Sequence, residues 1–280
     1  MKRSDKLAII AGFGSLPSQV INDATDKGWD VTVFSINGSF KISSNTYEII
    51  EIPNLNIKKI FSILQKHNIK NITMVGYITR PNDMSAYFNF SNIFFYLKFK
   101  NIINSGDSSL FNNLVKYIEG KGYNIIGAHQ ISSNLTLSDG LYSNAKVSNN
   151  ETDNIRIAYK VAKKIGNLDI GQSVVVSKER ILAVEAAEGT NSMLERVCGL
   201  RSGSTDKSGV FLKTSQNIQD NRLDMPTIGP KTVELVIKAN LSGVAITKGD
   251  VIVLEYEKII HLINENNLFF IVIDDFVTLE

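Results

Sequence analysis

The sequence has 280 residues, of which 43% are hydrophobic and 21% are charged. Its length exceeds the roughly 250 residues at which a single core stops growing, so we expect two domains. The composition excludes a disordered chain. Thirty lysines and arginines face 28 acids, for a net charge of +2. This balance argues against a nucleic-acid-binding protein, because such proteins carry a clustered basic face.

Three features bear on the compartment. The single cysteine, Cys198, excludes an intrachain disulfide framework and fits a reducing compartment. The N-terminal apolar run, KLAIIA, is too short for a secretory signal. The longest apolar run near the end, residues 268–273, is far shorter than the about 20 residues of a membrane span. We therefore expect a protein that is soluble or at most associated with a membrane surface.

Apolar periodicity predicts alternating strands and helices over residues 1–130. A strand at 6–11, a glycine turn, a helix at 16–27 and a strand at 29–36 form a βαβ unit with a right-handed crossover. The elements that follow are a strand at 47–52, a helix at 57–67, a strand at 71–77, a helix at 110–120 and a strand at 123–127. This pattern predicts an open parallel α/β sheet of the Rossmann-like kind.

Residues 132–150 lose this periodicity and fill with serine and asparagine, which predicts a linker. The elements expected beyond it are helices at 151–165, 193–200, 232–239 and 256–265, and strands at 173–176, 181–185, 210–213, 243–246, 251–254 and 268–273. We therefore predict a Rossmann-like domain over residues 1–131, a linker over 132–150 and a second α/β (α+β) domain over 151–280.

A glycine-rich turn, AGFGSLP at residues 11–17, joins the first strand to the first helix. Backbone N–H groups at such a helix start can hold a phosphate, which makes Gly12 and Gly14 candidate binding residues. A tight turn without a ligand is the alternative. Pro17 stands at the third glycine position of the dinucleotide fingerprint, and no acid ends the second strand, so NAD binding is disfavoured.

Carboxylates occur in two loops of the sequence that also have simple structural explanations. Asp107 precedes a predicted helix and is either its N-cap, which the spacing favours, or a functional acid at the edge of the sheet. AVEAAEGT at residues 183–190 carries Glu185 and Glu188 among small residues that let a ligand approach the backbone. A surface turn with solvated acids explains this segment equally well.

A third carboxylate, Asp224, lies in LDMPTIGP at residues 223–230, a stretch that its two prolines stiffen. A rigid loop that holds one acid just before a helix suits a metal ligand or a water-activating base, and an ordinary loop-to-helix junction is the alternative. Lys213 follows a strand and is either a partner for phosphate or a solvated lysine.

The segment at residues 84–103 is dense in aromatic residues interspersed with lysines. It is either an acyl-chain groove or membrane-facing patch, or a helix packed in the core, which we favour. The three histidines are scattered, so a zinc site is not expected. The glycine turn and the carboxylates that remain suit a hard cation such as Mg²⁺.

Together these motifs resemble the UDP-2,3-diacylglucosamine pyrophosphatases of the LpxI type. The resemblance rests on IAGFGSLP, GYITRPN, GDSSLF, IGNLDIGQSVVV, AVEAAEGT, DMPTIGP and LSGVAI, in this order along nearly the whole chain. It implies a cytoplasmic, Mg²⁺-dependent enzyme of lipid A synthesis that hydrolyses UDP-2,3-diacylglucosamine to UMP and 2,3-diacylglucosamine 1-phosphate. It also implies two domains with a ligand cleft between them, a homodimer, and transient contact with the cytoplasmic face of the inner membrane.

The resemblance places the catalytic aspartate at Asp224, which we also predict as the metal ligand. The predicted substrate-binding residues are Gly12, Gly14, Arg80, Asp107, Glu188, Gly189, Thr190 and Lys213. A non-catalytic protein that binds a sugar nucleotide or a lipid on the same fold is the alternative, and it predicts binding without turnover. A reductase is a third possibility, against which Pro17 argues.

Overall fold

The computed structural model describes residues 5–41, 46–53, 56–77, 107–216 and 220–274, apart from the side chains of residues 107–111. Arg80 and the aromatic segment at 84–103 lie outside these residues. The chain divides into two compact units. Unit 1 comprises Met1–Ser133 and Arg222–Asp224, and unit 2 comprises Asn134–Asn221 and Met225–Glu280.

A five-stranded sheet forms the centre of unit 1, and all of its strands are parallel. The strands, in the spatial order β3-β2-β1-β4-β5, are β3 (Glu48–Ile52), β2 (Asp30–Ile36), β1 (Lys6–Ala11), β4 (Asn71–Val75) and β5 (Asn124–Ile125). The helices among the described residues are α1 (Leu16–Asp26), α2 (Ile57–Lys66), α4 (Asp107–Glu119) and α5 (Ala128–Ile131). The predicted parallel α/β architecture is confirmed.

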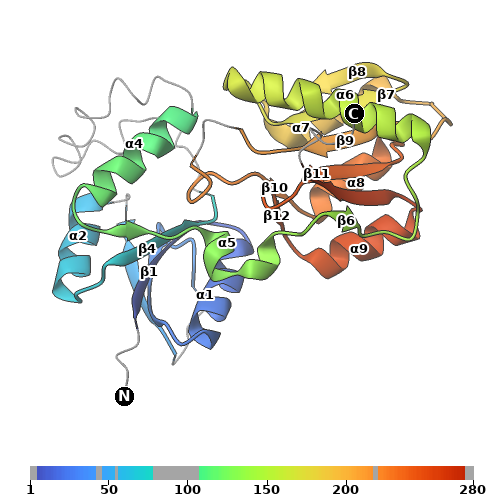
Figure 1. The fold of residues 1–280 in the computed structure, drawn as a ribbon. Coiled ribbons are helices and arrows are strands. Elements are labelled where there is room, and N and C mark those ends of the chain that lie inside the picture. The colour runs from blue at the N-terminus through green and yellow to red at the C-terminus, as the bar shows by residue number, and fades with distance from the viewer. Residues whose placement is uncertain (1–4, 42–45, 54–55, 78–106, 217–219, 275–280) are drawn as a thin grey trace. The chain divides into compact units, whose positions relative to one another are not determined.

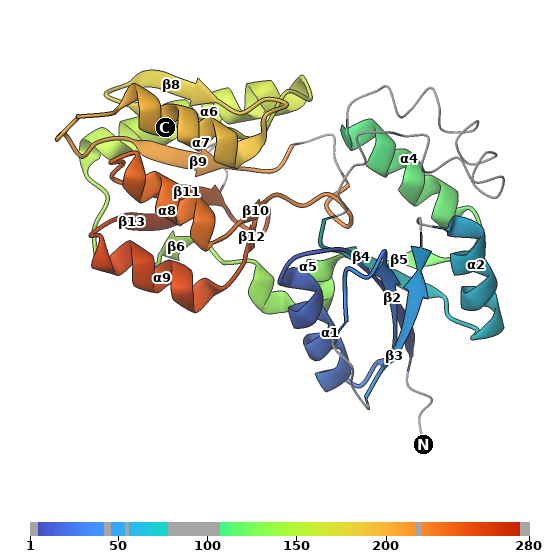
Figure 2. The ribbon, with the colours of Figure 1, turned by 180° about the vertical axis from the view of Figure 1, so that it is seen from behind.

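Helices cover both faces of this sheet (Figures 1 and 2). α1 and α5 pack against each other on one face, and α2 and α4 lie on the other. α1 buries Val20, Ile21 and Ala24, whose spacing of three and four residues places them on one side of the helix. β1 is buried from its second residue onward, because helices cover it from both sides.

A six-stranded mixed sheet forms the centre of unit 2. Its strands, in spatial order, are β6 (Gly140–Leu141), β13 (Phe269–Ile273), β11 (Gly243–Thr247), β9 (Val210–Lys213), β7 (Ser173–Ser177) and β8 (Arg180–Val184). β13, β11 and β9 are parallel, whereas β7 runs antiparallel to β9 and pairs with β8. The turn between β7 and β8 has positive φ at Lys178 and Glu179, which is typical of a two-residue hairpin.

The helices of unit 2 separate its core into two layers. The helices are α6 (Asn149–Asn167), α7 (Gly189–Leu200), α8 (Pro230–Lys238) and α9 (Tyr256–Glu265). α6 packs on the face that carries Val174 and Val176, whereas the other three helices pack on the face that carries Val175. The alternation of these valines follows from the two-residue period of a strand. A two-stranded sheet of β10 (Thr227–Ile228) and β12 (Ile252–Val253) completes the unit.

The segment at residues 132–150 is structured, although its composition predicts a linker. It contains a 3₁₀ turn (Ser133–Leu135), β6 and the start of α6. β6 pairs antiparallel with β13, and the Ser143 hydroxyl accepts a hydrogen bond from the Phe270 amide. Leu137 and Tyr142 also pack against the apolar core of unit 2, so backbone pairing and a few apolar contacts together order the segment.

No helix in the described part of the chain is long and apolar enough to cross a bilayer.

Candidate active site

Polar residues gather at one end of the mixed sheet in unit 2, which we call the polar edge: Ser173, Glu185, Lys213 and Thr247. Lys213 ends β9 and Thr247 ends the parallel strand β11. Ser173 begins β7 opposite Lys213, and the Glu185 amide donates to the Ser173 carbonyl. The carboxyl ends of parallel strands commonly form the ligand site of an open α/β sheet.

A hydrogen-bonded chain links three side chains at the polar edge. The Lys213 Nζ donates to the Thr190 hydroxyl over 2.6 Å, and that hydroxyl lies 2.7 Å from Glu185 Oε1, to which it donates. Lys213 and Glu185 are only 5% and 6% exposed. Buried charges of this kind are tolerated because an opposite charge and hydrogen bonds compensate them.

Several acceptors at the polar edge have no hydrogen-bond partner among the described residues. They are Glu185 Oε2 and Ser173 Oγ, and Gln172 Oε1, next to Ser173 in the sequence, is a third such atom. Each of these atoms is buried. Buried polar atoms without partners are uncommon in proteins, and a bound water, ion or ligand is one explanation for them.

The chain after β9 continues as a buried polar stretch, Thr214, Ser215 and Gln216. The Thr247 hydroxyl donates to the Thr214 hydroxyl over 2.9 Å, which ties the ends of β11 and β9 together. Around the buried Lys213 and Glu185, the polar edge is therefore lined by buried hydroxyls.

Glu188 and Gly189 lie next to this chain of side chains but differ from it in environment. Glu188 is exposed and receives a 2.7 Å hydrogen bond from Arg196, whose guanidinium holds the pKa of that carboxyl below its ordinary value. The Gly189 amide donates to the Ala186 carbonyl. Of the two acids in this segment, the structure thus places Glu185, rather than the predicted Glu188, beside Thr190 and Lys213.

The glycine turn of unit 1 is used for a close approach between backbones. The Gly12 amide donates to the Val75 carbonyl over 2.8 Å, and a Cβ added at Gly12 would meet the Tyr77 carbonyl oxygen at 2.5 Å. Gly14 has a positive φ of 110°, a conformation that favours glycine. The Gly12 amide, expected to bind phosphate, is therefore occupied by the backbone of β4.

The remaining predicted residues are spread over the chain. Asp224 is half-buried, follows β9 in the sequence and belongs to unit 1. The periodicity predicts a helix that begins at residue 110, three residues after Asp107. In the structure α4 begins at Asp107 itself, so this residue lies within the helix. The structure brings together Thr190 and Lys213, with Gly189 adjacent in α7.

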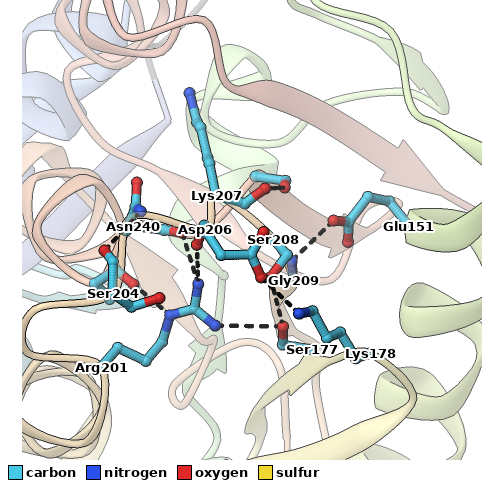
Figure 3. Close-up of polar contacts among 12 residues, drawn as sticks. Glu151, Ser177, Lys178, Arg201, Ser204, Asp206, Lys207, Ser208, Gly209 and Asn240 are labelled. Carbon is cyan, nitrogen blue, oxygen red and sulfur yellow. Dashed lines mark hydrogen bonds and ion pairs between the residues drawn. The ribbon is translucent and has the colours of Figure 1, made fainter.

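The opposite end of the same sheet carries a second polar cluster (Figure 3). There Glu151 accepts from the Gly209 amide with Oε1 and from Asn154 with Oε2. Arg201 donates to the carbonyl oxygens of Ala239, Asp206 and Asn240. Both oxygens of the buried Glu151 carboxylate accept hydrogen bonds, which indicates a structural cluster rather than a ligand site.

Glu185 is the site residue that the sequence pattern left undecided. Both acids of AVEAAEGT are flanked by small residues, so composition alone does not separate them. The available signal is position: Glu185 directly follows a strand, β8, whereas Glu188 is the N-cap of α7. A residue that directly follows a strand can lie at a sheet edge, and a helix cap is usually near solvent.

The fold defines the class of protein, a two-unit α/β protein with a buried lysine at the edge of one sheet. Comparison with known proteins defines the family. The model of the LpxI N-terminal domain matches residues 6–135, and that of the LpxI C-terminal domain matches residues 138–271. The chain therefore belongs to the LpxI family.

A relative from Caulobacter vibrioides, named UDP-2,3-diacylglucosamine pyrophosphatase LpxI, is 29% identical over 273 residues, which cover 96% of this chain and 98% of the relative. Among solved structures, WbmG of Bordetella bronchiseptica in complex with NAD matches 31% of this chain and 29% of its own at 15% identity and a TM-score of 0.26. A short-chain dehydrogenase of Leptospira borgpetersenii matches 34% of this chain and 44% of its own, at 18% identity and a TM-score of 0.25.

Proposed function

We propose that this protein hydrolyses the pyrophosphate bond of UDP-2,3-diacylglucosamine, which yields UMP and 2,3-diacylglucosamine 1-phosphate for lipid A synthesis. The observation that carries the proposal is the match of both LpxI domain models over nearly the whole chain. The name of the Caulobacter vibrioides relative gives the substrate. The buried lysine at the polar edge is consistent with an anionic ligand of this kind.

The chemical difficulty of this reaction is electrostatic, because water must attack a phosphorus that negative oxygens surround. Preorganised cations and donors lower that barrier. In our proposal the Lys213 ammonium, oriented by Thr190, binds a phosphate oxygen. Gly189 and Thr190 begin α7, and the positive end of that helix favours the same charge. Arg80, Asp107, Glu188 and the Gly12–Gly14 turn remain predicted substrate contacts.

We propose Mg²⁺ as the cofactor, with Asp224 as its protein ligand. Within the described ranges, no three His, Cys, Asp or Glu side chains lie close enough together to hold a metal. Mg²⁺ is commonly held by one or two carboxylates, with waters and substrate phosphates as its other ligands. A single carboxylate on a proline-flanked loop fits that mode of binding. Bound Mg²⁺ would neutralise charge on the phosphate oxygens, and Asp224 would also orient the attacking water.

The test is UMP release from purified UDP-2,3-diacylglucosamine, with Mg²⁺ and with EDTA. We expect turnover that EDTA abolishes and that Asp224→Ala lowers by far more than tenfold, or about 1.4 kcal/mol of activation free energy. Asp26→Asn, at the exposed end of α1, is the control variant. Turnover within tenfold of the wild type in Asp224→Ala would overturn the assignment of that residue. Binding of the lipid without any UMP release would favour a non-catalytic binding protein.

We further propose that the protein forms a homodimer, as the family resemblance implies. We also propose that it contacts the membrane surface transiently, since the proposed substrate carries two acyl chains. Sedimentation velocity tests the dimer. Flotation with anionic vesicles, with and without substrate in the bilayer, tests the membrane contact. A monomer at all concentrations, or a protein that never floats, would contradict the respective proposal.

A further inference from the structure

We propose that Glu185 is a positioning residue, which acts through the Thr190 hydroxyl to orient the Lys213 ammonium toward the substrate phosphates. The inference rests on the proposed function, in which Lys213 binds a phosphate oxygen. It adds a role for an acid that does not itself touch the substrate. Three observations carry it: the direction of the hydrogen bonds, the burial of the charges, and the unequal use of the two Glu185 oxygens.

The direction of the hydrogen bonds follows from the chemistry of the three groups. An ammonium can only donate, and an ionised carboxylate can only accept. The Thr190 hydroxyl, 2.6 Å from Lys213 Nζ and 2.7 Å from Glu185 Oε1, must therefore donate its one proton to Glu185 and accept from Lys213. Without the carboxylate, this hydroxyl would be free to rotate its proton toward the ammonium and lose the acceptor geometry.

The second observation is the burial of both charged groups. Lys213 and Glu185 are both more than nine-tenths buried, so the charge of each needs compensation from within the protein. The hydroxyl that stands between them keeps the acid from bonding directly at that point of the ammonium. Through this hydroxyl the carboxylate helps to compensate the buried charge of the lysine.

The two oxygens of Glu185 are used unequally. Oε1 accepts from Thr190, whereas Oε2 is buried without a partner among the described residues. At the opposite end of the same sheet, Glu151 uses both of its oxygens (Figure 3). An acid that served only the fold would be expected to resemble Glu151, because an unpaired buried oxygen is unfavourable. The unpaired oxygen leaves an acceptor at this edge that a water or a ligand group can fill.

The variants that test the proposal alter each link in turn. Thr190→Val keeps the shape of the side chain and removes the hydroxyl, and Thr190→Ser keeps the hydroxyl. Glu185→Gln keeps an acceptor and removes the charge. We expect kcat for UMP release to fall about tenfold to a hundredfold in Thr190→Val and in Glu185→Gln, and to stay within about threefold of the wild type in Thr190→Ser. Glu195→Gln, an exposed acid on α7, is the control.

A double-mutant cycle separates positioning from a general effect on the fold. If Glu185 acts through Lys213, then Glu185→Gln lowers kcat in the wild type but has little further effect in a Lys213→Met background. Equal losses in both backgrounds would overturn the proposal, as would wild-type kcat in Thr190→Val. Melting temperatures report whether any variant has lost its fold, and Thr190→Ser supplies a folded comparison.

A readout that needs no substrate keeps the proposal testable if the protein proves inactive toward the UDP-lipid. The ¹H–¹⁵N signal of the Lys213 ammonium should be observable in the wild type and in Thr190→Ser, because the hydrogen bond slows its exchange with water. It should broaden or shift in Thr190→Val and in Glu185→Gln. Signals that are identical in all four proteins would contradict the positioning role, whatever the outcome of the turnover assay.

Discussion

At the scale of single residues, Arg196 accounts for the different environments of the two acids in AVEAAEGT. Its guanidinium donates to Glu188 Oε1 over 2.7 Å and to the Val184 carbonyl over 3.2 Å. Glu188 is thereby held at the surface beside α7. Glu185, three residues earlier, is buried at the polar edge instead. A difference of three positions in the loop between β8 and α7 thus gives two chemically identical side chains different environments.

The first prediction concerns this ion pair. The hydrogen bond from Arg196 lowers the pKa of Glu188, so Arg196→Gln should raise that pKa toward its ordinary value. Because the folded pKa lies below the unfolded one, the pair stabilises the fold above the unfolded pKa of about 4.3, and this contribution is lost as the pH falls through the folded pKa. NMR titration of the glutamate carboxyl carbons measures the shift.

The carboxyl signal of Glu257, an exposed acid on α9, is the reference in that experiment. The stability difference between the wild type and Arg196→Gln should also shrink in acid, as denaturant unfolding at a series of pH values would show. If Glu188 titrates identically in the two proteins, the ion pair does not persist in solution.

At the scale of elements, the glycine turn after β1 pairs closely with the chain that follows β4. Phe13 and Tyr77 exchange backbone hydrogen bonds of 2.7 and 3.0 Å, directly after β1 and β4 end. Gly76 has a positive φ of 84°, and a Cβ added there would lie 2.6 Å from the Phe13 carbonyl oxygen. The glycines on both strands are therefore required by the close approach of the backbones.

The second prediction compares two glycines in different elements. Gly12→Ala should destabilise the protein by about 1–3 kcal/mol, because the added methyl group collides with the backbone at Tyr77. Gly199→Ala should stabilise it by about 0.5–1 kcal/mol, since this helical glycine on α7 is exposed and an added Cβ meets nothing within 4 Å. Urea unfolding of the two variants measures both effects. The changes in the free energy of unfolding should have opposite signs, and a neutral Gly12→Ala would contradict the close backbone approach at Tyr77.

At the scale of the whole molecule, the chain passes between the two units more than once. Residues 222–224 belong to unit 1, although the strands on either side of them in the sequence, β9 and β10, belong to unit 2. Arg222 bonds to Glu119 of α4 over 2.6 Å, and Leu223 packs on the apolar core of unit 1. Asp224 is the next residue. The acid that we propose as catalytic is therefore carried by a segment that unit 1 holds in place.

The third prediction follows from this anchoring. Arg222→Ala should lower kcat for UMP release by about tenfold or more, because a small displacement of a catalytic group is costly. Stability should change by only about 0–1 kcal/mol, since the Arg222–Glu119 pair is partly exposed, with 32% and 38% of the two side chains accessible. Kinetics and thermal unfolding of the same preparations measure the two effects.

Glu119→Gln removes the other half of the pair and should reproduce the loss of kcat. The double variant should then be no worse than either single variant, because the two residues act through one contact. Unchanged kcat in Arg222→Ala would show that this ion pair does not position Asp224.

The sequence by itself determined the layered α/β architecture of both halves. Runs such as KLAIIA and WDVTVFSI are long enough to span a sheet, and helical spacing between them specifies the crossovers, so local pattern suffices for β1, α1 and β2. The order of short motifs along the chain also sufficed to indicate the LpxI family. Each of these features is encoded within a few tens of neighbouring residues.

Only the tertiary structure decided which polar groups meet. Thr190 and Lys213 are 23 residues apart in the sequence and join at 2.6 Å because two strands end and one helix begins at the same sheet edge. The role of Gly12 depends on Tyr77, and the order in the Ser- and Asn-rich segment before α6 depends on pairing with β13. Such contacts are set by the packing of distant elements, and no local pattern records them.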